Sequence, residues 1–130
     1  KVKRIQSIRK KNWNIFNKLI DKLNTKQFYL IKSNKESTSA YHILALIFKT
    51  TKLANNFKKV FQHNNVAATF HYVPLHKSKM GKKFCNYKLP LTENIYTRVV
   101  RLPLYSEMTK QEINKISVLI KSFINKNNNY

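Results

Sequence analysis

The stretch Phe70-His71-Tyr72-Val73-Pro74-Leu75-His76, which a basic loop at residues 77–83 follows, decides how we interpret this chain. We interpret residues 66–73 as a strand that Pro74 ends, because proline has no N–H to donate to a central ladder. The strand therefore brings two histidines and a tyrosine to its end, where an exit loop can face a ligand. We look for function there.

The segments before this strand predict alternating elements. Residues 41–48 form an apolar run of strand length, and residues 51–63 repeat apolar side chains at helical spacing with Thr51 as the expected N-cap. Strand, helix and strand of these lengths predict a crossover unit or its split form in a ferredoxin-like sandwich. We expect His42, inside the first of these strands, to be a core histidine.

Residues 2–23 have the apolar spacing of a long amphipathic helix, and the polar segment 24–39 has room for one short strand at 28–31. After the central stretch we expect a loop at 75–91, a short helix at 92–99 and an edge-like strand at 100–105 containing Pro103. Thr109 and Glu112 form a capping-box pattern that begins a closing helix at 109–124.

Together these elements predict an α+β fold. A few-stranded, mainly antiparallel sheet is covered by the helices at 51–63 and 109–124 and is preceded by a long connecting helix. We divide the chain into that connecting helix, residues 1–24, and a single domain, residues 25–130. The segment 125–130 is polar, and we expect it to fray.

Two blocks of the sequence, "FHYVPLH" at 70–76 and "TENIYTRVVRLPLYSEMTKQEINKISVLIKSF" at 92–123, resemble the C-terminal domain of the DegT/DnrJ/EryC1/StrS sugar aminotransferases. The resemblance runs over residues 1–124. It implies the small domain of a fold-type I aminotransferase, a homodimer that uses pyridoxal phosphate. It also implies transfer of an amino group from glutamate to a 4-keto-6-deoxy sugar on dTDP. Separately, the lone thiol of Cys85 fits a reducing cytoplasm.

The resemblance also implies roles for individual residues. His71 and His76 would face the nucleotide sugar, with the Tyr72 hydroxyl at the rim, while Lys77 and Lys79 of the basic loop would approach its diphosphate as flexible point charges. The alternative is that the histidines are core or loop residues bonded to backbone, and that the loop is only a solvated basic segment. Because side chains alternate along a strand, His71 and Tyr72 can line one pocket only if the strand ends there.

The same resemblance assigns the Schiff-base lysine, the acidic partner of the pyridine nitrogen and the phosphate cup to a large domain upstream of Lys1. We therefore expect no catalytic residue and no bound pyridoxal phosphate in these residues, which alone should not transaminate. The chain is expected to be a fragment or a remnant. We expect Arg101, which matches the family's wording, to pair across domains.

The net charge of +21, from 26 basic and 5 acidic residues, raises the alternative of a small nucleic-acid-binding module. We do not favour it, because the lysines are scattered and we expect Phe57, Phe61, Phe70 and Phe123 to be buried. A third alternative is an interaction domain that docks through its first helix. Cys85 is the only cysteine, the histidines show no zinc spacing, and no apolar run has the length of a membrane span.

Overall fold

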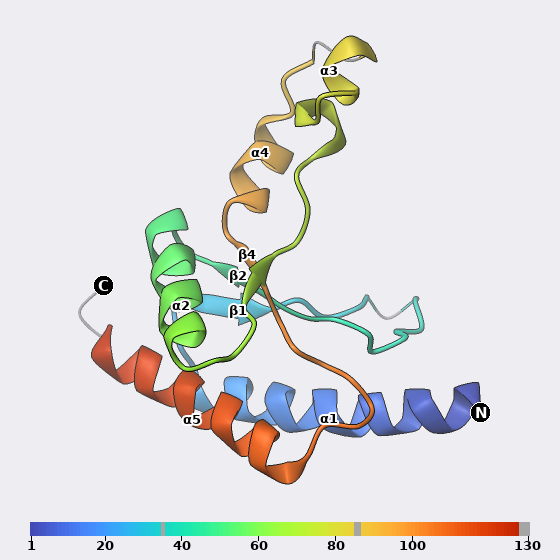
Figure 1. Cartoon of the computed structure of the whole chain (residues 1–130), viewed down its shortest axis with the longest axis vertical. Helices are drawn as coiled ribbons and strands as arrows, with labels where there is room; N and C mark the ends of the chain where they lie inside the picture. Colours follow the sequence, from blue (N-terminus) through green and yellow to red (C-terminus); the bar gives the residue numbers. More distant parts are fainter. Residues whose placement is uncertain (35, 85–86, 128–130) are drawn as a thin grey trace.

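The structure is a computed structural model that describes residues 1–34, 36–84 and 87–127. Within these residues four strands form one antiparallel sheet in the order β1-β2-β4-β3 (Figure 1). The strands are β1 (Phe28–Leu30), β2 (Leu44–Phe48), β3 (Thr69–Phe70) and β4 (Val99–Leu102). The expected α+β fold with a mainly antiparallel sheet is confirmed.

Three helices accompany the sheet: α1 (Val2–Leu23), α2 (Thr51–His63) and α5 (Lys110–Lys126). Three shorter helices, η1 (Leu75–Lys77), α3 (Gly81–Phe84) and α4 (Pro90–Tyr96), form an arm that projects away from this body (Figure 1). None of the arm helices contributes a buried residue. The body therefore holds the core. In the arm, η1 and α3 lie where we expected a loop, and α4 confirms the short helix that we expected at 92–99, shifted toward the N-terminus.

The connection from β2 through α2 to β3 is the split form of a crossover unit. Val100 of β4 pairs with Leu46 of β2 on one side and with Phe70 of β3 on the other, both antiparallel. The strands β2 and β3 are therefore parallel to each other and separated by β4. This confirms the split unit as one of the two forms that the sequence predicted.

Several expected strands are shorter in the structure, including the strand expected at 100–105, which ends at Leu102. Only Thr69 and Phe70 of the expected strand 66–73 are extended and paired, because the chain leaves the sheet after Phe70 to enter the arm. Val66 and Ala68, before β3, lie buried in the core. The expected strand 41–48 begins only at Leu44, since Tyr41 has a left-handed φ of 48° that a strand does not accommodate.

Two further expectations were wrong. The strand containing residues 100–102 is not an edge, because β4 lies between β2 and β3; Pro103 follows the end of β4 and so removes no hydrogen bond from its ladder. The N-cap of α2 is Thr50 and not Thr51. Thr50 has extended backbone, and its Oγ1 accepts the N–H of Leu53 at 3.2 Å.

The helices α1, α2 and α5 pack on one face of the sheet around a core of aromatic and aliphatic side chains. The strand residues Leu44, Leu46, Phe48 and Val100 face this core, whereas Ala45, Ile47 and Val99 form a small cluster on the opposite face. The first helix adds Phe16 and Ile20 to the main core. The division into a connecting helix, residues 1–24, and a domain, residues 25–130, stays a prediction.

The capping box of α5 is confirmed. Thr109 Oγ1 accepts the N–H of Glu112 at 3.2 Å, and the Glu112 carboxylate accepts the N–H of Thr109 at 2.7 Å. We expect Thr109→Ala to lower the free energy of unfolding by about 1 kcal/mol, because it leaves a helix N–H without its acceptor. Urea unfolding measures this, with Lys110→Ala, an exposed neighbour, as control. Equal midpoints for the two variants would contradict the prediction.

Candidate functional site

His71 and Tyr72 lie together where the arm leaves the body. Because β3 ends at Phe70, strand alternation no longer separates them, and their ring centroids are 4.6 Å apart. Both line a largely apolar cavity of about 530 Å³ between the start of the arm and α4. We expected these two residues to line one pocket only if the strand ended before them, and the strand does end there.

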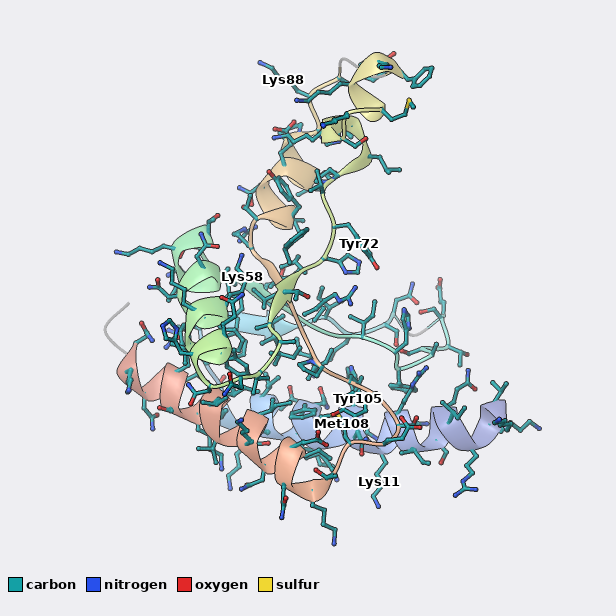
Figure 2. The ribbon with its side chains drawn as sticks, in the orientation of Figure 1. Lys11, Lys58, Tyr72, Lys88, Tyr105 and Met108 are labelled. Atoms are coloured by element: carbon teal, nitrogen blue, oxygen red, sulfur yellow. The ribbon has the colours of Figure 1, made fainter. Side chains whose placement is uncertain are left out.

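Tyr72 is held by a cation from the neighbouring strand. Its hydroxyl accepts a hydrogen bond from Arg101 Nη1 at 3.2 Å, and the guanidinium carbon lies 5.6 Å from the ring centroid. Figure 2 shows Tyr72 projecting from the chain near the base of the arm. The pairing of Arg101 across domains stays a prediction, since the contact observed is with Tyr72.

His71 is poised as a neutral imidazole. Burial lowers the pKa of His71 below its usual value, and the nearby charges of Arg101 and His42 lower it further. Its Nδ1 is buried without a hydrogen-bond partner in the described part of the chain. A neutral ring with a free nitrogen can accept or donate one hydrogen bond to a ligand.

We expect the measured pKa of His71 to be lowered by its burial and by the nearby positive charges. Its pKa, followed by the NMR shift of the ring Cε1–H, should lie below the ordinary histidine value of about 6.5, and Arg101→Gln should raise it. Because the pKa of His71 is lower in the folded chain, the unfolded chain binds a proton at His71 more tightly. The contribution of His71 to stability therefore falls as the pH drops through about 6.5, the pKa of a histidine in an unfolded chain. A pKa for His71 at or above the ordinary histidine value would contradict the assignment.

The second histidine belongs to a separate cluster inside the arm. Glu93 of α4 pairs with His76 Nε2 at 3.3 Å and with Lys77 Nζ at 2.7 Å, which joins η1 to α4. Hydrogen bonds from Lys77 and from the N–H of Leu89 lower the pKa of Glu93, and the same pair raises the pKa of Lys77. The pairing is therefore present at neutral pH and is lost as the carboxylate is protonated in acid.

The structure does not bring all five predicted site residues together. His71 and Tyr72 share a cavity that neither His76 nor Lys77 lines, and the side chain of His76 is only 8% exposed and faces Glu93. Lys79 is exposed and lies outside this cavity. The substrate roles of His71, Tyr72, His76, Lys77 and Lys79 stay predictions.

Sequence reasoning missed Glu93 and the contact of Arg101 with Tyr72. A signal for Glu93 was present, because a chain with 26 basic and 5 acidic residues offers few carboxylates with which its cations can pair. The contact between Tyr72 and Arg101 had no local signal. It joins residues 29 positions apart, and only the pairing of β3 with β4 brings them together.

Two residues were placed wrongly. His42 is exposed, precedes β2 and lines a second cavity, so it is not a core histidine. Phe70 is 54% exposed, because it lies on the short edge strand, whereas Phe57, Phe61 and Phe123 are buried as expected. The argument from buried aromatics against nucleic-acid binding therefore holds for three of the four residues.

The residues around His71 do not fit the requirements of pyridoxal phosphate, which needs a lysine for the Schiff base and a carboxylate for the pyridine nitrogen. Asp21 pairs with Lys32, Glu93 with His76 and Lys77, and Glu112 caps α5. Neither cavity that His71 borders is lined by a carboxylate. We therefore derive no step through the cofactor from these residues.

Within residues 1–34, 36–84 and 87–127, no group of three or more histidine, cysteine, aspartate or glutamate side chains could hold a metal ion. No helix in the same described ranges has the length and apolarity to cross a membrane. Cys85 and residues 128–130 of the predicted frayed tail lie outside the described residues.

The architecture and sequence together define the class of protein. The fold of this chain, an antiparallel sheet with helices on one face, is also found in solved sugar aminotransferases. Residues 1–121 match the model of the DegT/DnrJ/EryC1/StrS aminotransferase family. The chain belongs to this family.

Two curated relatives are each 26% identical to this chain over the aligned residues. An uncharacterized protein of Methanocaldococcus jannaschii is 26% identical over 99 residues, which cover 72% of this chain and 26% of that protein. The dTDP-3-amino-3,6-dideoxy-alpha-D-galactopyranose transaminase of Aneurinibacillus thermoaerophilus is 26% identical over 76 residues, or 58% of this chain and 21% of that protein. The matched region thus spans about a quarter of each relative.

Solved structures share the fold at lower identity. The aminotransferase TlmJ of Streptoalloteichus hindustanus superposes with a TM-score of 0.85 at 13% identity, covering 96% of this chain and 33% of that one. PseC of Helicobacter pylori, an aminotransferase in pseudaminic acid biosynthesis, gives 0.80 at 13% identity and covers 94% and 33%. This chain therefore has the fold of about one third of each of those proteins.

Proposed function

We propose that this chain is the substrate-closing part of a pyridoxal-phosphate-dependent sugar-nucleotide transaminase in the cytoplasm. The amino group comes from glutamate and goes to a 4-keto-6-deoxy sugar on dTDP. The product class is that of a dTDP-4-amino-4,6-dideoxygalactose transaminase, which serves the synthesis of lipopolysaccharide or enterobacterial common antigen sugars. The working enzyme is a homodimer, and residues outside this chain hold the cofactor.

The family match over residues 1–121 is the observation that carries this proposal. The name of the Aneurinibacillus thermoaerophilus relative supports a dTDP-linked amino sugar as the product class. The volume of the cavity beside His71 and Tyr72, about 530 Å³, is within the usual range for a small-molecule site.

The chain's own residues suit the binding of a neutral sugar that is linked to a charged diphosphate. The imidazole of His71, which borders the cavity, can hydrogen-bond a sugar hydroxyl, and Tyr72, positioned by Arg101, offers a second polar group at the mouth of the same cavity. His76 and Lys77 fix the arm through Glu93, and the exposed Lys79 supplies a point charge for a diphosphate. In this scheme the arm orients the substrate and the cofactor performs the transfer.

The test uses the protein at the length its source cell produces, loaded with pyridoxal phosphate. We measure glutamate-dependent amination of a dTDP-linked 4-keto-6-deoxy sugar. We expect His71→Gln to lower kcat/KM by about 10-fold, mainly through KM, because one hydrogen bond to the bound sugar is lost. His63→Gln, which changes an exposed histidine at the end of α2, should leave kcat/KM unchanged.

No amination by the wild-type protein of any dTDP-linked keto sugar would overturn the proposed substrate. Equal kinetics for His71→Gln and His63→Gln would keep the enzyme class and remove His71 from substrate binding. Sedimentation of the same sample tests the homodimer.

A further inference from the structure

The far end of the arm carries exposed apolar side chains. Met80, just before α3, Phe84, at its end, and Tyr87 are 61%, 81% and 77% exposed. Within the described helices and strands of the body, only Val2 has a large apolar side chain as exposed as these. Folded proteins rarely gather such side chains in one place unless a partner covers them. This concentration marks the end of the arm as an interaction surface.

The turn between η1 and α3 gives this end a defined shape. Ser78 Oγ donates a hydrogen bond to the Leu75 carbonyl at 2.7 Å and accepts the N–H of Gly81 at 2.8 Å. The helix α3 lies at the end of the arm that is farthest from the body (Figure 1). Because the turn is already ordered, a partner that binds there pays little for fixing its backbone.

The same segment is strongly basic. Lys79, Lys82, Lys83 and Lys88 are exposed, and none of them forms an ion pair within the described residues. Residues 72–92 contain no aspartate or glutamate. Figure 2 shows Lys88 projecting from the far end of the arm. Cations therefore lie among the exposed apolar side chains, so the complementary surface is apolar and carries negative charge.

A lipid surface fits this composition better than a nucleic acid does. Lysine suits lipid headgroups, because its apolar stem can lie along hydrocarbon while its ammonium group stays in water. Nucleic acids are held by arginine forks and by grooves that follow the strand. All four arginines lie outside residues 72–97, and α3 is on a projecting end (Figure 1). Met80 adds a flexible aliphatic chain, which gains from contact with hydrocarbon.

We propose that the end of the arm binds the surface of an anionic lipid bilayer. The three exposed apolar side chains insert at the boundary between headgroups and acyl chains, while Lys82, Lys83 and Lys88 contact the negative headgroups. None of these six residues has a role in the proposed substrate site. The inference therefore stands whether or not the chain serves a transaminase.

The test uses the protein at the length its source cell produces and measures sedimentation with vesicles at about 0.15 M salt, where attraction between distant charges is screened. Vesicles of phosphatidylcholine and phosphatidylserine in equal parts are compared with vesicles of phosphatidylcholine alone. We expect saturable binding to the first and at least about 10-fold weaker binding to the second, because the lysines lose their counter-charges there.

A pair of lysine substitutions tests the charges. Lys82→Gln combined with Lys83→Gln is expected to weaken binding about 25-fold, since each lysine near an anionic membrane contributes about fivefold. The matched control combines Lys115→Gln with Lys121→Gln, which removes the same charge from exposed positions of α5, away from the arm (Figure 1). The control should change binding little. Circular dichroism establishes that both variants are folded.

Insertion of the apolar side chains is measured separately. Phe84→Ala is expected to weaken binding about 10-fold, because its ring no longer leaves water on binding. Phe84→Trp places a fluorescent side chain at the end of the arm, and brominated lipid should quench its emission. The wild-type protein is the control, since its Trp13 lies on α1 in the body, and its emission should be quenched much less.

Four outcomes would overturn the proposal. One is the absence of binding to phosphatidylserine vesicles, as when another part of the protein covers the arm. Another is an equal loss in the arm variant and the α5 control, which would show attraction to the overall charge alone. Binding without quenching of Phe84→Trp would exclude insertion. If Phe84→Ala weakens binding of a thymidine oligonucleotide as much as binding of vesicles, the arm is a nucleic-acid surface. None of these results bears on the amination assay, so the two proposals fail separately.

Discussion

Replacing Phe57 by alanine is expected to lower the free energy of unfolding by about 3–5 kcal/mol. Phe57 is fully buried on the inner face of α2, and it is the centre of an aromatic cluster. Its ring centroid lies 4.2 Å from Phe61, 4.9 Å from Phe48 and 5.0 Å from Phe123. The substitution removes those contacts and leaves a cavity that the rigid rings around it cannot fill.

The expected loss is a large part of the stability of a domain of this size, for which about 5–15 kcal/mol is usual. Urea unfolding, followed by circular dichroism, measures it. Phe84→Ala is the matched control, because it removes the same ring from an arm residue that is 81% exposed, and it should change the midpoint little. A similar loss in both variants would show that the core is not centred on Phe57.

The helices of the body could be predicted from the sequence because each carries its signal locally. The apolar spacing of residues 51–63 and the capping box of Thr109 and Glu112 involve neighbours within one or two turns. Helix ends and faces follow from such patterns. The error at the N-cap of α2 is a shift from Thr51 to Thr50, where two threonines offered the same chemistry.

The errors concern features that depend on distant residues. Nothing local shows that β3 stops after Phe70 or that β4 is central, because both depend on which strands pair. The partner of His76 is 17 residues away and that of Tyr72 is 29 residues away. The motif at 70–76 therefore predicted the region of the site. That His76 lies outside the cavity of His71 could not be predicted, because it depends on tertiary contacts within the arm.

Gly81→Ala is expected to open the tip of the arm without unfolding the body. A Cβ at position 81 would overlap the backbone carbonyl of Leu75, and backbone cannot move aside as a flexible side chain can. Gly81 also donates its N–H to Ser78 Oγ at 2.8 Å, within the turn that joins η1 to α3. Glycine is thus required here for a close approach, since its φ is not positive.

Such overpacking costs about 1–3 kcal/mol, which corresponds to roughly 5- to 150-fold in the population of the open form. We expect amide hydrogen exchange in residues 77–84 to accelerate within this range. The urea midpoint of the body should stay in place, because the arm helices bury no residue in the core. Lys82→Ala, at the next and exposed position, should leave exchange unchanged.

The result also tests how the arm positions its charged residues. If η1 and α3 separate, His76 and Lys77 lose their fixed distance to Glu93, so the NMR shift of the His76 ring should move toward that of the exposed His63. The environment of His71 should not change, because β4 and Arg101 hold that part of the chain. Unchanged exchange in Gly81→Ala would show that η1 and α3 do not pack as the structure has them.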